Sequence, residues 1–240
     1  MTKRIALLVG GAGGIGGALL EHVLADDSIG RVFATSSREV SSAHAKLEWL
    51  PLDYMNGESI RHLAETLCGQ LDRIDLFICA TGYLHGEYGQ PEKGISSLRI
   101  ASMESLYRLN ASGPLDLFAR CAPLLKASRS PRALFLSAQV GSIEDNMLGG
   151  WFSYRMAKAA LNMGIKTAAI EAGRWRNGAV IMAVHPGTTR SALSRPFVVR
   201  RKQRVRSAAE SAQHIYHLLE EAGEECNGAF LTAEGGKLHW

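Results

Sequence analysis

Seven short apolar runs recur along this chain of 240 residues, and most of them are separated by stretches with the three-and-four spacing of amphipathic helices. Polar residues hardly interrupt the runs, as between Ile5 and Val9. Strands that are apolar at nearly every position are typical of a parallel sheet buried on both faces. The pattern therefore predicts an α/β fold, with a single doubly wound parallel sheet and helices on both faces. The expected strands are Arg4–Val9, Arg31–Thr35, Leu47–Leu52, Ile74–Ala80, Ala133–Ser137, Ala179–His185 and Ala229–Leu231.

Two long helices are expected, one within residues 103–126 and one within residues 154–175. Pro123 lies near the end of the first, where a kink or a stop is tolerated. The chain contains no internal repeat, low-complexity tract or linker. With 46% hydrophobic and 21% charged residues it has the composition of a folded protein, and we expect residues 1–240 to form a single domain.

The charge and the cysteines argue against several kinds of site. The formal net charge is +4, and six basic residues lie within Arg195–Arg206, so the excess is local and lacks the broad basic face that a nucleic-acid site needs. The cysteines are widely spaced, which argues against a metal site and a disulfide framework and favours a reducing cytoplasm. They are Cys68, Cys79, Cys121 and Cys226.

The uncharged stretch Ile5–Leu20 has some features of a signal peptide or a membrane span. It holds six glycines within sixteen residues, and it is shorter than the roughly 20 residues that a spanning helix needs. A strand, a glycine turn and the start of a helix account for it better, so we expect neither secretion nor a membrane partner.

The first predicted strand ends at a glycine-rich turn, in which Gly10, Gly14 and Gly16 precede an apolar helix. Glycines at such a turn allow a tight bend, let the backbone approach a pyrophosphate and let the helix pack closely on the strand. The helix N-terminus, which includes Ile15, offers free N–H groups and the positive end of its dipole to phosphate. Because the turn follows the first strand of an alternating chain, it predicts a dinucleotide-binding sheet of the Rossmann type rather than a merely structural turn.

The end of the second predicted strand indicates which dinucleotide is bound. In Rossmann units an acid about 20 residues beyond the glycines accepts hydrogen bonds from the adenosine ribose, whereas a nearby arginine suits the 2′-phosphate of NADP. Counting from Gly16 leads to Ser36, with no carboxylate at the strand end, and Arg38 follows with a guanidinium that can pair with phosphate. The sequence thus favours NADP(H); the alternative is an arginine that is simply solvated in a turn.

Tyr154 and Lys158, four residues apart, open the second long helix and lie on one face of it. A tyrosine with a pKa near 10 is a poor acid-base catalyst at neutral pH. Lowering that pKa by about three units takes roughly 4 kcal/mol, and a cation about 4 Å away at an effective dielectric of about 20 supplies a similar amount. We therefore expect Lys158 to lower the pKa of Tyr154; an amphipathic surface pair is the alternative.

These features, in this order, resemble those of the short-chain dehydrogenase/reductase family, and the resemblance covers nearly the whole chain. It implies an NADP(H)-dependent oxidoreductase that moves a hydride between nicotinamide and a carbonyl or alcohol carbon of a small molecule. It also implies a catalytic set of Asn110, Ser137, Tyr154 and Lys158. In this set the serine polarises the carbonyl, the tyrosine transfers the proton, the lysine also holds the nicotinamide ribose, and the asparagine supports a water in the proton relay.

Further positions match family motifs at the ends of later strands, with two departures. Val9 stands where the family often has a threonine, and Cys79-Ala80 replaces two asparagines. The additional cofactor-binding residues that the resemblance implies are Asp53, Gly82, Tyr154, Lys158, Pro186, Gly187, Thr188 and Thr189.

The substrate-facing serine has two candidates. The family commonly has Ser-Ser at the strand end before the tyrosine, whereas this chain has Ser137-Ala138 and a longer connection to Tyr154. Either Ser137 or Ser142 provides the hydroxyl, and we favour Ser137.

Within the family, the segments 141–143, 149–151, 158–162 and 185–188 resemble the branch that contains the bacterial C-factor signalling proteins and the insect carbonyl reductase Sniffer. This implies carbonyl reduction with NADPH, and the family resemblance suggests a homodimer or homotetramer assembled through the two long helices. The alternative is an NAD(P)-binding signalling protein whose turnover is incidental or absent.

The basic segment Arg195–Arg206 follows the Pro-Gly turn and so occupies the position of the family's substrate lid. Its cations either attract an anionic substrate or hold the cofactor phosphates, or they simply face water in a loop leading to a helix at Ser207–Ala222. The functional interpretation and the solvated loop both stay open at this point.

Overall fold

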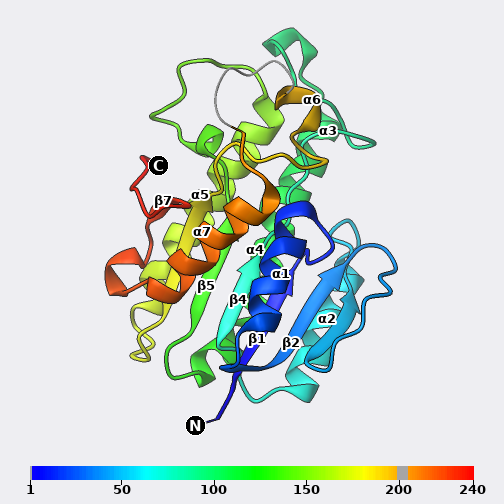
Figure 1. Ribbon diagram of the computed structural model, residues 1–240. Helices are drawn as coiled ribbons and strands as arrows, with labels where there is room; N and C mark the ends of the chain where they lie inside the picture. Colours follow the sequence, from blue (N-terminus) through cyan, green and yellow to red (C-terminus); the bar gives the residue numbers. More distant parts are fainter. Residues whose placement is uncertain (1, 199–204) are drawn as a thin grey trace.

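The computed structural model describes residues 2–198 and 205–240, which form an α/β fold around a seven-stranded sheet (Figure 1). All neighbouring strands pair in parallel, in the order β3-β2-β1-β4-β5-β6-β7. The strands are β1 (Arg4–Val9), β2 (Ile29–Ser36), β3 (Leu47–Pro51), β4 (Leu76–Cys79), β5 (Arg132–Leu136), β6 (Val180–His185) and β7 (Phe230–Thr232). The predicted doubly wound sheet of Rossmann type is confirmed.

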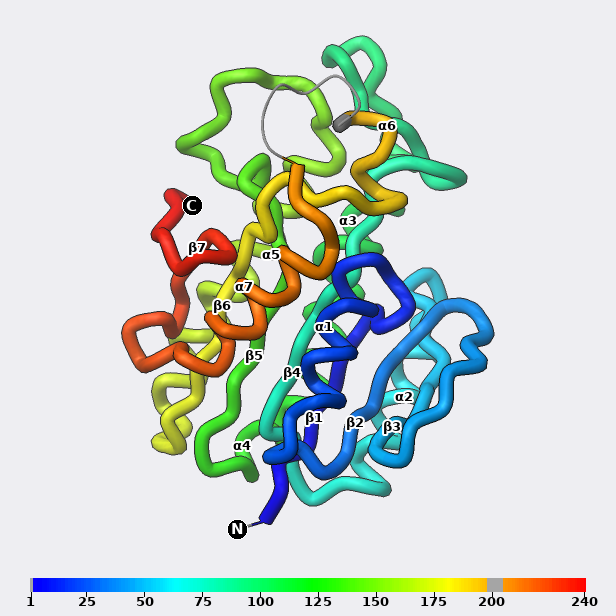
Figure 2. Tube along the Cα trace, in the orientation of Figure 1, coloured from blue at the N-terminus to red at the C-terminus, as the bar shows by residue number. Residues whose placement is uncertain are grey.

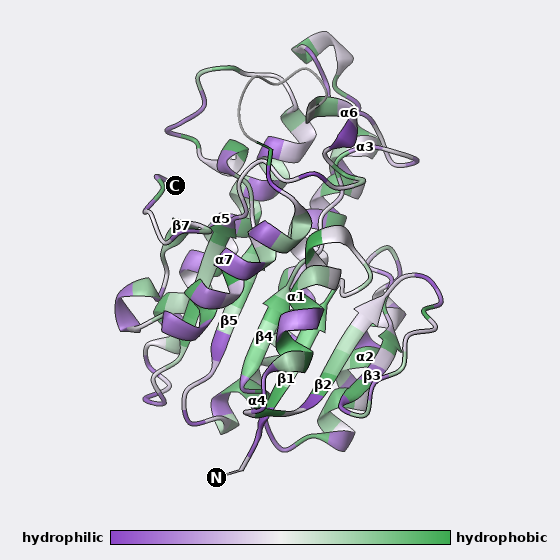
Figure 3. Ribbon diagram, in the orientation of Figure 1, coloured by the Kyte–Doolittle hydropathy of each residue, from purple (hydrophilic) through white to green (hydrophobic). Residues whose placement is uncertain are grey.

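The central strands are buried on both faces, whereas the residues of the edge strand β3 are only partly buried or exposed. Successive residues of β1 contribute to two different cores, with Leu7 in one and Leu8 in the other, and neither side chain is exposed. The same alternation holds in β4, where Phe77 and Ile78 belong to opposite cores. Coloured by hydropathy, the central strands β1 and β4 are apolar along most of their length (Figure 3). This double burial is the reason why uninterrupted apolar runs, rather than alternating ones, mark the strands in the sequence.

Helices cover both faces of the sheet. They are α1 (Gly14–Ala25), α2 (Gly57–Gln70), α3 (Ile100–Tyr107), α4 (Gly113–Ala127), α5 (Phe152–Ala172), α6 (Arg195–Val198) and α7 (Ala208–Glu221). Helices α1 and α7 pack against each other over one face, and α2, α4 and α5 cover the other (Figure 1). Within the described ranges, no helix is both long and apolar enough to cross a membrane.

The first long helix differs in detail from the prediction. It begins at Ile100 rather than near residue 103, and a π-helical turn over Arg108–Ser112 separates α3 from α4. Pro123 lies inside α4 and does not end it. The other long helix, α5, agrees with its predicted range to within three residues at each end.

The strand order reverses between β1 and β4, which are neighbours in the sheet although β2 and β3 lie between them in the chain. In doubly wound sheets, ligands bind beyond the carboxyl ends of the strands at such a reversal. The N-terminus lies at the opposite end of the molecule, and the loops that follow β4, β5 and β6 gather beyond the carboxyl ends (Figure 2). The fold therefore brings the glycine turn, Gly82, Ser137 and Pro186 to one edge of the sheet.

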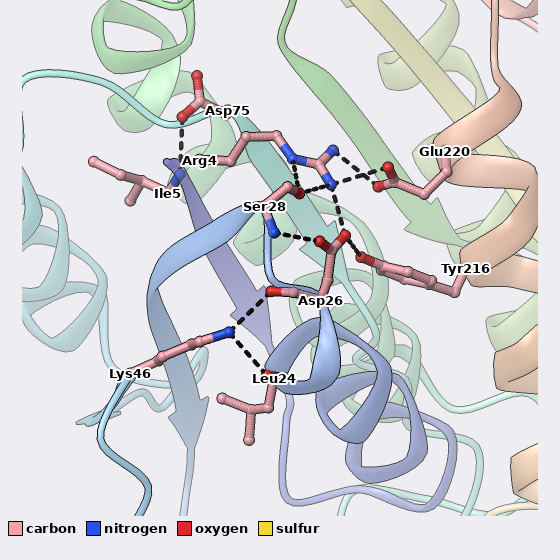
Figure 4. A network of polar contacts seen from close by, with 9 residues as sticks. All are labelled: Arg4, Ile5, Leu24, Asp26, Ser28, Lys46, Asp75, Tyr216 and Glu220. Atoms are coloured by element: carbon pink, nitrogen blue, oxygen red, sulfur yellow. Dashed lines mark hydrogen bonds and ion pairs between the residues drawn. The ribbon is translucent and has the colours of Figure 1, made fainter. Parts of the chain in front are cut away.

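A network of charged side chains joins the first strand to α1 and α7 (Figure 4). The Arg4 guanidinium donates to Asp26 Oδ2 at 2.8 Å and to Glu220 Oε1 at 3.0 Å. The Tyr216 hydroxyl donates to the same Asp26 oxygen at 2.7 Å. Burial opposes the ionisation of Asp26, but hydrogen bonds from Ser28 and Tyr216 and the charge of Arg4 outweigh it and lower the pKa of Asp26 to about 2. The network therefore stabilises the fold most when Asp26 is ionised.

We predict that Asp26→Asn lowers the free energy of unfolding at neutral pH by about 1–2 kcal/mol, once solvent screening of these part-exposed groups is allowed for. Because folding lowers the pKa of Asp26, its contribution is present above the ordinary pKa of 3.8 and is lost as the pH falls toward about 2. Urea denaturation of both proteins between about pH 5 and about pH 2 should therefore show the difference shrinking.

The control is Asp72→Asn, which removes an exposed carboxylate beside Arg73 and should change the stability by less than about 0.5 kcal/mol. A difference between wild type and Asp26→Asn that stays constant as the pH falls would contradict the role of the network.

Candidate active site

The glycine turn is held by a threonine from the neighbouring strand. Gly10 has a φ of 86°, a left-handed conformation that favours glycine. Its N–H donates to Thr35 Oγ1 at 3.1 Å, and the N–H of Gly11 donates to the Thr35 carbonyl at 3.0 Å. Thr35 is 1% exposed. Val9 has no hydroxyl to brace the glycine turn, and Thr35 of β2 supplies one instead. The glycine motif alone does not reveal this contact.

Helix α1 approaches the turn so closely that Gly16 has no room for a side chain. A Cβ at Gly16 would lie 2.1 Å from the Gly10 carbonyl oxygen. The N-cap residue is Gly13, which has no side chain to cap the first N–H groups, and the first turn carries no acidic residue. Uncapped N–H groups at a helix N-terminus attract phosphate. Because Gly14 and Ile15 of this turn line the adjoining cavity, the turn fits the pyrophosphate of a dinucleotide.

A cavity of about 520 Å³ lies over the ends of β1, β2 and β4. At its β2 side the Ser36 hydroxyl accepts the Arg38 N–H at 3.1 Å, and Arg38 Nη2 donates to the Ala12 carbonyl at 3.0 Å. Asp53 supplies the one carboxylate among the described residues that line this cavity, and it accepts the Met55 N–H at 2.8 Å. A 2′-phosphate at the end of β2 would thus meet the exposed guanidinium of Arg38 rather than an acid.

A second cavity, of about 380 Å³, continues from the first toward α5. The two cavities share Gly13 and Gly82, so they form one trough across the reversal of strand order. Tyr154, Lys158 and Pro186 also line the second cavity. The trough begins beside Arg38, passes the N-terminus of α1 and reaches α5, which is the outline that an extended dinucleotide needs. We name it the cofactor trough.

Tyr154 and Lys158 come from successive turns of α5 and are both buried. Lys158 Nζ lies 6.0 Å from the centroid of the Tyr154 ring and donates to the Leu136 carbonyl at 2.9 Å. Burial raises the pKa of Tyr154 above its usual range and, against a smaller effect of Cys79, lowers the pKa of Lys158 to about 8. The expected lowering of the tyrosine pKa is therefore wrong for the protein alone, because burial disfavours the charged form of each group and leaves the phenol protonated.

Of the two candidate serines, Ser137 lines the cofactor trough with Tyr154. Its hydroxyl donates to Asn162 Oδ1 at 2.6 Å. The hydroxyl of Ser142 donates instead to the Trp240 carbonyl at 3.2 Å and accepts a backbone N–H of its own loop. Ser142 thus holds a loop together, whereas Ser137 is placed to meet a ligand.

Asn110 lies in the π-helical turn and is 1% exposed. Its amide donates to the carbonyls of Tyr83 and Leu106 at 2.8 and 3.0 Å, and its Oδ1 accepts the Tyr83 N–H at 2.9 Å. Tyr83 follows Gly82 and lines both parts of the cofactor trough. Asn110 therefore shapes the trough through the backbone of Tyr83. π-Helical turns are frequent at functional sites, and this one brings the Asn110 amide to the loop after β4.

The residues of the turn after β6 line two cavities, the cofactor trough and a third cavity of about 570 Å³. Pro186 lines both, whereas Gly187, Thr188 and Thr189 line the third. The Thr189 hydroxyl lies 2.6 Å from that of Ser211, and Thr189 is 4% exposed. Thr189 is predicted to bind the cofactor, but its hydroxyl makes hydrogen bonds to Ser211 of α7 and to carbonyls of its own turn.

The third cavity adjoins Ser137 and Tyr154, and we name it the substrate cavity. Trp151 packs edge-on against Tyr154 and Phe197, with ring centroids 6.3 and 5.0 Å apart. The apolar and aromatic residues lining the cavity include Leu84, Val140, Leu148, Trp151, Leu193 and Phe197. Polar and charged residues, among them Gln139, Asp145, Arg155 and His185, line the same cavity. A cavity with this mixed lining fits a small molecule that has an apolar part and one or more polar groups.

Two features that the sequence did not reveal hold the start of α5. Trp151, the N-cap residue, has a φ of 54°, and the two glycines before it are also left-handed. The carboxylate of Glu92 accepts both the N–H and the hydroxyl of Ser153. Glu92 is 5% exposed, and a negative charge at a helix N-terminus is stabilising. A buried carboxylate from a distant loop therefore caps the helix one residue before Tyr154.

The predicted substrate lid lies only partly within the described residues, because residues 199–204 fall outside them. At its end, Arg206 pairs with Glu234 and its N–H donates to the Thr188 carbonyl at 2.9 Å. Arg206 thus supports the turn after β6. Attraction of anionic substrates by the rest of the segment stays a prediction.

Over residues 4–230, which contain every part of this site, the chain matches the family model of short chain dehydrogenases. It belongs to that family. The fold of this short chain dehydrogenase is similar to that of the carbonyl reductase Sniffer of D. melanogaster, with 21% identity, a TM-score of 0.86 and complete coverage of both chains. An NADPH-bound carbonyl reductase from chicken fatty liver is 27% identical, with a TM-score of 0.87 and the same coverage.

Among curated relatives of this short chain dehydrogenase, the C-signal of Myxococcus xanthus is 26% identical over 140 residues, which are 58% of this chain and 80% of that protein. The predicted resemblance to the branch that holds the C-factor proteins and Sniffer is thereby confirmed.

We predict that Gly16→Ala weakens NADPH binding at least tenfold and lowers the free energy of unfolding by about 1–3 kcal/mol, because a methyl group 2.1 Å from a carbonyl oxygen forces α1 away from the turn. Fluorescence titration and urea denaturation measure the two effects. The control is Gly69→Ala in α2, where an added Cβ meets nothing within 4 Å. It should be neutral or stabilise by up to about 1 kcal/mol. Unchanged NADPH affinity in Gly16→Ala would disprove the close approach.

Proposed function

We propose that this short chain dehydrogenase is an NADPH-dependent carbonyl reductase in which Tyr154 is the proton donor. The observation that carries the proposal is that Ser137 and Tyr154 lie where the cofactor trough meets the substrate cavity, with Lys158 beside them in the trough. A carbonyl group in the substrate cavity would thus reach both hydroxyls. The 27% identity to the NADPH-bound carbonyl reductase of chicken fatty liver supports the same activity.

The protein groups divide the chemistry among them, while bound NADPH supplies the hydride. Ser137 would donate a hydrogen bond to the carbonyl oxygen and so draw electrons from the carbon that receives the hydride. Burial raises the pKa of Tyr154, so the phenol carries its proton when the substrate arrives, as reduction requires. The ammonium of Lys158, whose Nζ lies 6.0 Å from the ring centroid, would stabilise the phenolate left after the transfer.

A second candidate function is that of an NAD(P)-binding signalling protein with incidental or no turnover, because the chain is similar to the C-signal of Myxococcus xanthus. The placement of Ser137 and Tyr154 at one cavity favours the enzyme, since binding a dinucleotide alone does not need a serine and a tyrosine facing a separate cavity.

We predict that Tyr154→Phe lowers kcat for carbonyl reduction by about 100- to 10,000-fold while NADPH binding stays near wild type, because the ring packs similarly but has no proton to give. Steady-state rates on a panel of apolar aldehydes and ketones, with NADPH titration, measure both. Tyr107→Phe, at a 48% exposed position on α3, is the control and should change neither.

Rapid reduction by Tyr154→Phe would exclude Tyr154 as the proton donor. A wild-type protein that binds NADPH but reduces no member of the panel would support the signalling function instead.

We predict that the wild type binds NADPH more tightly than NADH, and that Arg38→Glu weakens NADPH binding by at least about tenfold while NADH binding changes little. The reason is that Arg38 lies just beyond the end of β2, where the 2′-phosphate would sit, and that the strand ends in Ser36 rather than in an acid. Isothermal titration with each cofactor measures the preference. Arg129→Glu, an equal charge change at an exposed position beyond α4, should leave the preference unchanged. Equal wild-type affinities for the two cofactors would refute it.

We further propose a single-domain cytoplasmic protein that forms a homodimer or homotetramer. All four cysteines are unpaired, which suits a reducing compartment. On α5, Met156, Met163 and Ile170 recur every seven residues and are 50%, 67% and 57% exposed. This apolar stripe is a surface that a second copy would bury. Light scattering on the purified protein measures the assembly directly.

A further inference from the structure

A buried asparagine outside the predicted catalytic set contacts the serine of the proposed site. Asn162 lies one helical turn beyond Lys158 on α5 and is 3% exposed. Its Oδ1 lies 2.6 Å from Ser137 Oγ, which is itself 4% exposed. The other end of the same amide, Nδ2, is buried without a hydrogen-bond partner among the described residues. Within the described part of the chain, the Ser137 hydroxyl thus has Asn162 as its hydrogen-bond partner, and the contact uses the oxygen of that amide but not its nitrogen.

In this arrangement Ser137 has no hydrogen for a substrate. A hydroxyl has one hydrogen to donate and two lone pairs with which to accept. While Asn162 Oδ1 accepts that hydrogen, Ser137 can only accept from a ligand, and a carbonyl oxygen has nothing to donate. Polarisation of a carbonyl by Ser137 therefore requires the hydrogen to be released from Asn162.

A half-turn of the Asn162 amide about its Cβ–Cγ bond releases the hydroxyl hydrogen of Ser137. The two ends of a carboxamide have nearly the same shape, so the half-turn exchanges donor and acceptor without new space. Nδ2 would then donate to Ser137 Oγ, and the serine hydrogen would be free to point into the cavity. The exchange also gives the unpartnered Nδ2 an acceptor and leaves Oδ1 unpaired instead. Among buried backbone groups, an unpaired oxygen is more common than an unpaired N–H.

We propose that Asn162 is a positioning residue that donates an amide N–H to Ser137 Oγ and thereby directs the serine hydroxyl hydrogen at the substrate carbonyl. The inference rests on the proposed function, because it requires Ser137 to polarise that carbonyl. Asn162 is not among the described residues that line the cofactor trough or the substrate cavity, so it acts through Ser137.

The informative variant is Asn162→Asp, which keeps the size of the side chain. A carboxyl group only accepts when it is ionised, and it has a hydrogen to donate when it is protonated. Burial raises the pKa of such a group above about 3.9. At about pH 8 we expect the ionised carboxylate to take the serine hydrogen and to lower kcat by about 100-fold or more, the effect of removing one donor from an oxyanion site. KM and NADPH binding should change little.

As the pH falls, the ratio of the variant's kcat to that of the wild type should rise, because the introduced carboxyl becomes protonated and donates to Ser137. The titratable groups nearby are the same in both proteins, so their own titration largely cancels in the ratio. These groups include Cys79, Asp145, Tyr154, Arg155, Lys158 and His185.

Two outcomes would overturn the proposal. If Asn162 serves only as an acceptor, the ionised carboxylate replaces it well, and the kcat ratio falls rather than rises as the pH is lowered. If Asn162 only fills space, Asn162→Asp lowers the melting temperature and leaves a ratio that does not depend on pH.

A second set of variants separates this inference from the proposed function. Ser137→Ala should lower kcat by about 100-fold or more, whereas Ser142→Ala, a matched change at a buried serine that lines neither the cofactor trough nor the substrate cavity, should leave kcat near wild type. Wild-type turnover by Ser137→Ala would remove the serine from the proposed function, whatever Asn162 does.

If Ser137→Ala is slow, Asn162→Asp should have no further effect on kcat in that background, because the two residues act through one hydroxyl. An equal loss in both backgrounds would overturn the role of Asn162 while leaving that of Ser137 intact. Should the carboxyl variant fail to fold, Asn162→Ala makes the same distinction. It should lower kcat with KM unchanged in the wild type and have no effect in Ser137→Ala.

Discussion

Burial of the sheet on both faces is the constraint on which the rest of this structure depends. With apolar side chains along most of the central strands, polar groups are largely excluded from the faces of these strands and collect where the strands end. At the reversal of strand order between β1 and β4, the loops that follow the two strands diverge and leave a crevice at the carboxyl ends of the strands. Two helices then begin there. The N-terminus of α1 is left uncapped beside the trough, whereas that of α5 is capped by a carboxylate.

The same exclusion of water decides the protonation of the site. From the sequence, a lysine close to the tyrosine under moderate screening predicted a lowered tyrosine pKa. In the structure Lys158 Nζ is 6.0 Å from the centroid of the Tyr154 ring, its hydrogen bond goes to Leu136, and the loss of hydration dominates for both groups. Desolvation thus outweighs charge pairing until a ligand changes the surroundings, and it holds the tyrosine in the form that donates a proton.

The features that could be predicted from the sequence are those that depend on residues close together in the chain. The apolar runs revealed the parallel sheet, the glycine spacing revealed the turn that Gly16 packs against, and the i, i+4 spacing of Tyr154 and Lys158 placed both at one cavity. The contacts that escaped prediction join distant segments. Thr35 holds Gly10 from 25 residues away, and Glu92 holds Ser153 from 61. No local pattern carries such pairings, since they exist only once the elements have packed.

The cap on α5 also bears on the order in which the molecule folds. Most of α5 is held by hydrogen bonds between residues a few positions apart. Its first turn, which carries Tyr154, also needs the hydrogen bond from the Ser153 N–H to Glu92, which lies 61 residues earlier in the chain. Closing a loop of that length costs chain entropy that the local turn cannot recover by itself. The reactive end of α5 should therefore become ordered only when the segment after β4 docks, and on partial unfolding the two should be released together. The turn that carries Tyr154 is therefore completed late in folding, although most of the hydrogen bonds of α5 join residues that are close in the sequence.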